Sequence, residues 1–213
     1  MRRETTTAGG VKTPTAVGAA RKDQILQIAA ELFSRRGYHA TSMRDLAEGA
    51  GLLPGSLYAH FTGKEEILYQ IVLDAARQFL GGMEALRAQR ASPEEKFRRA
   101  MRAHVAVVAH DLEGARVFLH EWKALGGSRL TEIRDLRRRY EELWDEIIRH
   151  VAPSDSKLAR LLALSAANWT YVWYDPNGPL GPEEIADRFS DLLLDGLRTS
   201  VKGKVSVERR VRS

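Results

Sequence analysis

The stretch from Thr41 to Lys64 reads TSMRDLAEGAGLLPGSLYAHFTGK, and it decides the fold of this chain. Its pattern predicts two short helices joined by a glycine turn and followed by the start of a third helix. Ser42 stands three positions before Asp45, which is the spacing of a capping box at a helix start. The apolar residues that follow recur with the period of one helix face: Met43, Leu46, Ala47 and Ala50.

Glycine and proline mark the turn and the second helix. Gly49 and Gly51 bracket the end of the first helix, where a left-handed backbone or a close helix approach favours glycine. Pro54 suits the first turn of the next helix, because its missing N–H would have no partner there. Leu57 and Phe61 are expected to face the core. The other positions of this helix carry small or hydrogen-bonding groups: Gly55, Ser56, Tyr58 and His60. A short helix with such a face has the right size for the DNA major groove.

Positive charge gathers at the two ends of the chain. Residues 1–64 carry nine Lys and Arg against five Asp and Glu, and residues 201–213 carry five against one. Residues 65–200 carry 19 against 22 and are slightly acidic. A basic reading surface on a slightly acidic body is typical of a phosphate-binding module joined to a domain that does not bind DNA.

The composition limits the class of protein. With 213 residues and 44% hydrophobic residues, the chain can bury a sizeable core in one or two domains. The absence of cysteine excludes disulfides, thiolate zinc sites and cysteine nucleophiles. The first twenty residues contain no apolar targeting segment, and no run approaches the length of a membrane span. We therefore expect a cytoplasmic protein without a membrane partner.

Helical periodicity runs through most of the chain and predicts an all-α fold. A helix is expected from Lys22 to Arg36, a longer one from Lys64 with a break or kink at Gly81 and Gly82, and another behind a second capping box at Ser92. Further helices are expected over 112–125, 129–151, 156–174 and 182–200. The predicted segments are a disordered basic arm (1–20), a three-helix helix-turn-helix domain (21–67), a helical ligand-binding and dimerisation domain (68–200) and a basic tail (201–213).

The stretch from Arg21 to Ile71 resembles the N-terminal region of the TetR family of transcriptional regulators. Two sequence motifs carry the resemblance. The first is Gly37-Tyr38-x-x-Thr41, and the second is Gly-Ser-Leu-Tyr-Ala-His-Phe-Thr-Gly-Lys-Glu at 55–65. The resemblance implies a helix-turn-helix head on a dimeric helical body whose ligand cavity controls DNA affinity. It also implies these DNA-contacting positions: Ser42, Arg44, Gly55, Ser56, Tyr58, His60 and Lys64.

The chemistry of these side chains agrees with such contacts. Arg44 can reach a guanine edge or a phosphate, whereas Tyr58 and His60 can donate hydrogen bonds to phosphate oxygens. Arg21 and Lys22 stand just before the first helix and could add backbone contacts. The alternative is that Tyr58 and His60 are half-buried residues of an amphipathic helix.

A second resemblance lies near the C-terminus. The run Trp169-x-x-x-Trp173-Tyr174-x-Pro176-x-Gly178-Pro179-Leu180 is similar to a TetR subgroup. Members of that subgroup repress fatty-acid, steroid or phenylacetate degradation and respond to acyl-CoA thioesters, which implies such an effector and no other cofactor. The candidate ligand residues are the aromatic ones of the body: Phe118, Trp122, Trp144, Trp169 and Trp173. At helical spacing such residues are also common in ordinary cores.

Two apolar stripes near the C-terminus predict a homodimer. The first comprises Ala159, Leu162, Ala163 and Ala166, and the second comprises Phe189, Leu192, Leu193 and Gly196. Small and leucine side chains allow close helix packing. A dimer would set two recognition helices on a palindromic operator. The two resemblances imply that the chain is a repressor released from DNA by its effector. The alternatives are a constitutive regulator whose body only dimerises, a repressor of another hydrophobic ligand, and a small-molecule binding or enzymatic domain with a vestigial DNA reader.

Enzyme chemistry is not expected. Gly63-Lys64 resembles the end of a phosphate-binding loop, but Tyr58 stands where the loop needs a glycine and Glu65 where it needs a hydroxyl. The six histidines show no i, i+3 or i+4 pairing with each other, so no metal site is predicted.

Overall fold

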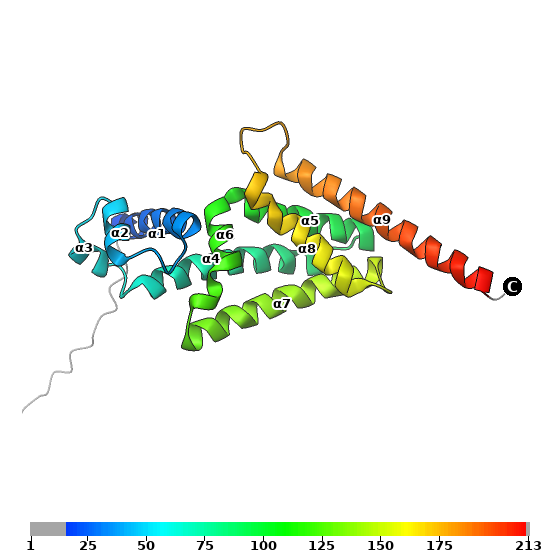
Figure 1. Ribbon diagram of the computed structural model, residues 1–213, viewed down its shortest axis with the longest axis horizontal. Coiled ribbons are helices and arrows are strands. Elements are labelled where there is room, and N and C mark those ends of the chain that lie inside the picture. The colour runs from blue at the N-terminus through cyan, green and yellow to red at the C-terminus, as the bar shows by residue number, and fades with distance from the viewer. Residues whose placement is uncertain (1–15, 212–213) are drawn as a thin grey trace, which may run out of the picture.

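The computed structural model describes residues 16–211 and contains nine α-helices, one short 3-10 helix and no strand in that range (Figure 1). The helices are α1 (Ala16–Arg36), α2 (Met43–Gly49), α3 (Pro54–Tyr58), α4 (Lys64–Arg87), α5 (Pro93–His110), α6 (Leu112–His120), α7 (Gly127–Val151), α8 (Ser156–Trp173) and α9 (Pro182–Val211), and the 3-10 helix is η1 (Trp122–Ala124). The all-α prediction is confirmed. The molecule is elongated, with α1 to α3 at one end and the last turns of α9 at the other.

Local sequence signals explain the first helices. The Ser42 hydroxyl accepts a hydrogen bond from the Asp45 N–H at 3.1 Å, and the Asp45 carboxylate accepts one from the Ser42 N–H at 2.7 Å, so the predicted capping box is present. Gly51 has a φ of +62°, in the region that favours glycine. A Cβ on Gly49 would lie 3.0 Å from Ile28 Cγ2, so the missing side chain lets α2 approach α1.

The predicted break at Gly81 and Gly82 is wrong, because α4 runs unbroken from Lys64 to Arg87. Core side chains hold the helix on both sides of the glycines, with Phe79 and Met83 fully buried. A Cβ on Gly82 would meet the Cβ of Ala103 at 3.4 Å, so this glycine leaves room for α5 rather than ending α4. The helix also crosses the predicted domain boundary at 67/68, which stays a prediction.

The two ends of the chain are more helical than predicted. Residues 16–20 belong to α1 rather than to a disordered arm, and residues 1–15 lie outside the described residues. The last helix continues to Val211 instead of ending at 200, so most of the predicted basic tail is helical, and residues 212–213 lie outside the described range. Adding residues to an existing helix costs much less free energy than nucleating a new one. No proline follows Pro182, so nothing in the sequence ends α9 early.

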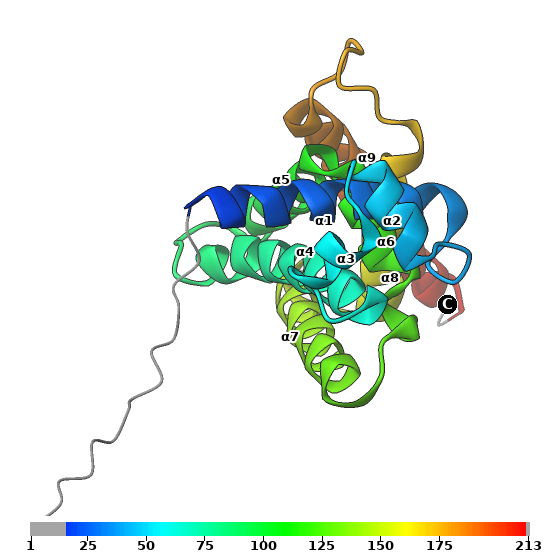
Figure 2. The same cartoon turned by 90° about the vertical axis from the view of Figure 1, so that its left-hand side faces the viewer.

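The core has two parts that meet along α4. The first joins the head, α1 to α3, to the near half of the body, and the second fills the far half between α4, α5, α7, α8 and α9. Ile67 and Leu68 of α4 belong to the first part, whereas Leu80 and Met83 belong to the second. Seen from the head end in Figure 2, α1, α2 and α3 lie in front of the body helices. A single helix therefore connects the head to the centre of the body.

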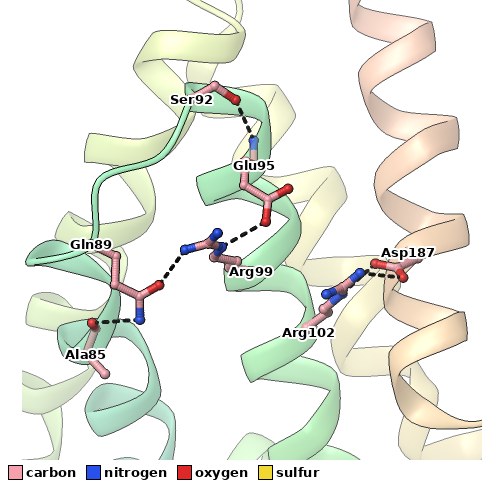
Figure 3. A network of polar contacts seen from close by, with 7 residues as sticks. All are labelled: Ala85, Gln89, Ser92, Glu95, Arg99, Arg102 and Asp187. Carbon is pink, nitrogen blue, oxygen red and sulfur yellow. Dashed lines mark hydrogen bonds and ion pairs between the residues drawn. The ribbon is translucent and has the colours of Figure 1, made fainter.

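Polar contacts stabilise the connection between α4 and α5 (Figure 3). The Ser92 hydroxyl accepts from the Glu95 N–H at 3.2 Å and caps α5. The predicted second capping box is only half formed, because the Glu95 carboxylate accepts from Arg99 Nε at 2.8 Å instead of returning to the Ser92 backbone. Arg99 Nη1 also donates to Gln89 Oε1 at 2.7 Å, and Gln89 Nε2 donates to the Ala85 carbonyl at 3.2 Å.

Two ion pairs attach α9 to α5. Arg102 donates from Nε to Asp187 Oδ1 at 2.7 Å and from Nη2 to Asp187 Oδ2 at 2.8 Å, as Figure 3 shows. Arg98 pairs with Asp191 one turn further along α9 at 2.5 Å. A two-pronged arginine–carboxylate pair fixes orientation as well as distance. It therefore fixes which face of α9 packs on α5.

Candidate functional site

The recognition helix α3 is anchored by two core side chains. Leu57 on α3 and Phe61, three residues after its end, are fully buried, as predicted, and hold this segment on the head. The opposite side of α3 is open to solvent at Gly55, Ser56 and Tyr58, and the Tyr58 side chain is 56% exposed. Figure 2 shows α3 at the front of the molecule when it is viewed from the head end. The head therefore presents this face away from the body.

Two predicted contacts lie at the start of α2 and one lies beyond α3. Ser42 and Arg44 are exposed, and His60 is half-buried. The Ser42 hydroxyl is occupied by Asp45, to which it donates as well. Among residues 16–211, the Arg44 guanidinium has no hydrogen-bond or ion-pair partner. Of the predicted DNA contacts, Arg44 is thus the cation that makes no polar contact within the described part of the chain.

Lys64 is turned into the head. Its Nζ donates to the carbonyl oxygens of Tyr38 at 2.8 Å and Thr41 at 2.7 Å, and it lies 4.3 Å from the centroid of the Tyr38 ring. These contacts tie the turn after α1 to the first residue of α4. The ammonium is engaged by the fold, so we leave Lys64 out of the DNA contacts proposed below.

The two cations before the predicted first helix are also used by the fold. Arg21 Nη2 donates to the Ala50 carbonyl at 3.2 Å, at the end of α2, and Lys22 Nζ lies 5.1 Å from the centroid of the Phe61 ring. Both groups stabilise the packing of α1 against the rest of the head.

The five aromatic candidates do not share one pocket. Trp144 is fully buried in the far half of the core, where it packs edge-on against Phe97. Trp169 and Trp173 are 59% and 44% exposed on the outer side of α8. Phe118 and Trp122 share one neighbour, because both rings contact the guanidinium of Arg137.

A small cavity lies between α4, α5, α6, α7 and α8. Its open volume is about 40 Å³, and since about 10–15 Å³ of such volume holds one water, it has room for a few waters. Phe79 and Phe118 stack on each other at 5.2 Å on its apolar side. The lining residues are Phe79, His104, Phe118, Leu119, Arg137, Tyr140, Glu141, Leu164 and Asn168. The cavity therefore joins aromatic and aliphatic walls to a few polar groups.

A buried histidine organises the polar side of this cavity. His104 Nε2 contacts Asn168 Oδ1 at 3.0 Å, and its Nδ1 contacts the Tyr140 hydroxyl. An amide oxygen can only accept, so Nε2 carries the proton and Tyr140 donates to Nδ1. Burial lowers the pKa of His104 to about 4 and raises the pKa of Tyr140 well above its usual value. The three groups are therefore neutral at pH 7.

The sequence alone does not assign Arg137 to the ligand: Arg129 and the run Arg137-Arg138-Arg139 could meet a CoA phosphate or carboxylate, but such a run is also typical of a solvated face. Its guanidinium lies 5.0 Å from the Phe118 centroid and 4.7 Å from the Trp122 centroid, at the edge of the cavity. In the run Arg137-Arg138-Arg139 the other two arginines point outward, and each is paired with an acidic residue. The inner face of α7 recurs with helical spacing at Ile133, Arg137, Tyr140 and Trp144. This spacing could have predicted that Arg137 points inward while Arg138 and Arg139 point outward.

A second, larger cavity of about 200 Å³ lies at the end of the body far from the head. Its walls come from α4, α5 and α7, with Met83, Leu86, Leu143 and Ile147 on its apolar side, and Arg87, Lys96, Glu146 and His150 also line it. Arg87 pairs with Glu146 at 3.8 Å. No helix of the head contributes to this cavity.

The walls of the smaller cavity connect directly to the head. Helix α6 packs on α1 and α4, and its last residue, His120, is 2.8 Å from the Tyr171 hydroxyl of α8. At the start of α7, the Gly126 N–H donates to Glu65 at 3.3 Å, and Tyr69 donates to Glu132. A displacement of α6 or α7 would therefore also move α1 and α4, the helices that hold α3 in place.

The outer side of α8 carries exposed apolar residues before and after Ser165, and the predicted stripe on this helix is only partly correct. Ala159 and Ala163 are buried against α5 and α9. Of the other two predicted residues, Leu162 is 58% exposed and Ala166 is half-buried. Among the side chains of α8 and α9 that the structure describes, up to residue 197, the exposed large apolar ones are Leu158, Leu161, Leu162, Trp169, Val172, Trp173 and Leu192. A patch of this kind on a folded chain marks an interaction surface.

Within residues 16–211, no three His, Asp or Glu side chains are grouped so that they could hold a metal ion. A search of the same residues finds no helix long and apolar enough to cross a membrane.

A helix-turn-helix head joined by one helix to an all-helical body with an internal cavity defines the class of helix-turn-helix transcriptional regulators. Two family models match the chain. The model described as "Bacterial regulatory proteins, tetR family" matches residues 25–71, and "Tetracyclin repressor-like, C-terminal domain" matches residues 90–197. The chain belongs to the TetR family, which makes it a DNA-binding transcriptional regulator and not an enzyme.

Relatives and solved structures cover most of the chain. The HTH-type transcriptional repressor KstR2 of Mycolicibacterium smegmatis is 30% identical over 85% of this chain and 93% of its own length. The TetR family regulator PfmR from Thermus thermophilus has a TM-score of 0.71 at 37% identity, covering 81% of this chain and 98% of that one. AibR, solved in complex with isovaleryl coenzyme A and operator DNA, has a TM-score of 0.70 at 27% identity over 82% of this chain and 98% of its own.

Proposed function

We propose that this protein is a cytoplasmic homodimeric repressor that binds a palindromic operator and is released from it by an acyl-CoA thioester. The observation that carries the proposal is the position of the small cavity. Its walls include α4 and α6, which connect to the head, and α8, which bears the exposed apolar stripe. A ligand in this cavity would act on the helices that set the spacing of two DNA-reading heads.

The proposed DNA surface is the exposed side of α3 together with the start of α2. Gly55 and Ser56 allow close approach to base edges, and Tyr58 and His60 donate to phosphate oxygens. Arg44 supplies a positive charge that forms no ion pair within the described chain. The Ser42 hydroxyl is engaged by Asp45 in the capping box, so, like Lys64, it is left out of these contacts.

Dimerisation would bury the stripe on α8 and α9 against its own copy. A two-fold axis through this stripe makes one set of apolar residues complementary to itself, as symmetric dimers require. Arg102 and Asp187 hold α9 in place from the side opposite to Leu192, which is open to solvent. The two heads would then meet successive major grooves, about 34–36 Å apart or a multiple of that distance.

Two observations support an acyl-CoA effector. AibR was solved with isovaleryl coenzyme A, and the cavity of the present chain has an apolar side of the kind an acyl group needs. Each buried methylene contributes about 0.8 kcal/mol, so a short acyl chain is enough to bias a two-state equilibrium. The open volume of about 40 Å³ is smaller than any such chain. Binding therefore requires the walls to separate, which favours the form whose heads no longer fit the operator.

The test is a titration of the protein–operator complex, followed by the fluorescence anisotropy of labelled DNA. Isovaleryl-, octanoyl- and phenylacetyl-CoA are added, with free CoA as the control. We expect at least one thioester to release the DNA at micromolar concentration and free CoA to be at least tenfold weaker. Tight operator binding that no thioester affects would instead support a constitutive regulator or one that senses another hydrophobic ligand.

A further inference from the structure

Arg137 is a cation that the fold stabilises by stacking but does not pair. Among residues 16–211 its guanidinium has no hydrogen bond and no ion pair, although two aromatic rings lie within 5.0 Å of it. Burial lowers its pKa from the usual value, which reflects lost hydration. Stacking covers the faces of a guanidinium and leaves its N–H edge free for a planar, two-pronged acceptor.

The charge of Glu141 acts on Arg137, but the Glu141 carboxylate forms its ion pair with another arginine. Glu141, one turn along α7 and also at the cavity, accepts from Arg160 Nη1 at 2.9 Å. The exposed neighbour Arg138 pairs with Asp135 at 2.8 Å. The edge of the cavity therefore keeps a positive charge without an ion-pair partner next to an apolar wall.

Asn168 offers a second free group in the same cavity. Its Oδ1 accepts from the neutral His104, and this fixes the amide so that its NH2 is the remaining donor. Within the described residues that NH2 has no hydrogen-bond partner. It comes from α8, whereas Arg137 comes from α7, so the two donors face the cavity from different walls.

We infer that Arg137 and Asn168 form the polar end of the effector site. They would take an acyl compound that places its carbonyl oxygen on the Asn168 amide and a negatively charged group on the Arg137 guanidinium, with its apolar part between Phe79 and Leu164. This inference rests on the proposed function for the role of the ligand and names its chemistry. The anion is supplied either by the phosphates of a CoA thioester or by the carboxylate of a free acid.

The experiment compares Arg137→Gln with the control Arg138→Gln, an exposed arginine one position away on the same helix. Calorimetric titration uses three probes with one acyl group: octanoyl-CoA, octanoate and the uncharged thioester S-octanoyl-N-acetylcysteamine. We expect Arg137→Gln to weaken binding of a charged probe at least tenfold and to leave the uncharged probe within twofold of the original protein. Arg138→Gln should change none of them. Asn168→Leu should weaken every probe that binds, the uncharged one included.

The outcomes separate the source of the anion. A loss confined to octanoyl-CoA assigns the charge to its phosphates, and a loss with octanoate assigns it to a carboxylate. Equal weakening of charged and uncharged probes, or a lower melting temperature with unchanged binding, overturns the inference and makes Arg137 a structural residue. If thioesters release the operator equally from Arg137→Gln and from the original protein, the inference fails and the proposed function stands. If octanoate binding depends on Arg137 but no thioester releases the operator, the site stands and the acyl-CoA function fails.

Discussion

The ammonium of Lys64 donates to the carbonyl oxygen of Tyr38 at 2.8 Å and lies 4.3 Å from the centroid of the Tyr38 ring. The same ammonium also bonds to the Thr41 carbonyl. One lysine thus closes the loop between α1 and α2 onto the first turn of α4. Lys64 therefore stabilises the head itself, unlike the residues proposed above to contact DNA.

Replacing Lys64 by Met should lower the stability of the head. Hydrogen bonds to charged groups contribute about 1.5–3 kcal/mol, and the carbonyl oxygens would be left with only partial solvation. We expect urea denaturation to report a loss of about 2 kcal/mol. At temperatures where the variant is folded, the salt dependence of operator binding should keep its slope. A shallower slope with unchanged stability would show that Lys64 contacts phosphate instead.

Replacing Arg44 by Met should weaken DNA binding and leave stability unchanged, the opposite of the result expected for Lys64→Met. The guanidinium has no partner within residues 16–211, so its removal should leave the unfolding free energy within about 0.5 kcal/mol. Operator affinity should fall for specific and nonspecific DNA alike, and the plot of log affinity against log salt should become shallower by about one unit for each phosphate that is no longer neutralised. Tyr58→Phe, which removes only the hydroxyl, should show a smaller fall with the salt slope nearly unchanged. Equal affinity for the original and both variants would place the DNA surface elsewhere.

Two adjacent residues of α8 distinguish interface from core. Leu162 is 58% exposed and Ala163 is fully buried. Leu162→Asp should give a folded monomer with weak DNA binding, because the dimer would have to bury an unpaired charge at a cost of several kcal/mol. Ala163→Arg should unfold the body. Sedimentation and circular dichroism separate the two results, with Thr131→Asp on the exposed side of α7 as a control. A dimeric Leu162→Asp protein would show that the stripe is not the interface.

The caps and the buried side of the helix-turn-helix could be predicted from the sequence, because they depend on residues close together in the chain. Ser42 and Asp45 form their capping box within four residues, and Leu57 on α3 and Phe61 just after it are buried among exposed positions. The left-handed turn at Gly51 is equally local. Such features do not depend on where the rest of the chain lies.

The body was harder to predict, because several of its helices are apolar on more than one side. On α8 the run Leu161-Leu162-Ala163 gives an inner and an outer apolar face, and periodicity cannot say which of them meets a partner. The direction of Lys64 was missed for a related reason: a family resemblance supplies a position but not the carbonyl oxygens that attract the side chain. Trp169 was assigned to a pocket by its type, whereas its exposure is set by the register of α8.

Stability should depend on pH through His104. The folded protein holds this histidine neutral until the pH falls to about 4, whereas an unfolded chain takes up the proton near its ordinary value of 6.5. Unfolding therefore binds a proton between these two values, and stability falls as the pH drops through that window and is constant above it. The largest contribution is about 3 kcal/mol, at pH 4 and below.

The measurement is urea denaturation between pH 4.5 and 7.5 for the original protein and for His104→Gln, which keeps polar groups but cannot titrate. Carboxylates with lowered pKa values, such as Asp187, also lose stabilisation as the pH falls, and they do so in both proteins. The difference between the two curves should therefore grow as the pH falls below 6.5. Parallel curves would show that His104 is not held neutral.

The central claim is that a ligand in the body changes the separation of two DNA-reading heads. Because the chain has no cysteine, Glu31→Cys gives a single spin label per protomer on the exposed side of α1. Double electron–electron resonance then measures the distance between the two labels in the free protein, with operator DNA and with an acyl-CoA thioester. We predict one narrow distance on DNA, and a distribution shifted by several ångströms with the thioester, which the DNA-bound form does not populate. The same distance in all three states, in a protein that the thioester does release from DNA, would contradict the account.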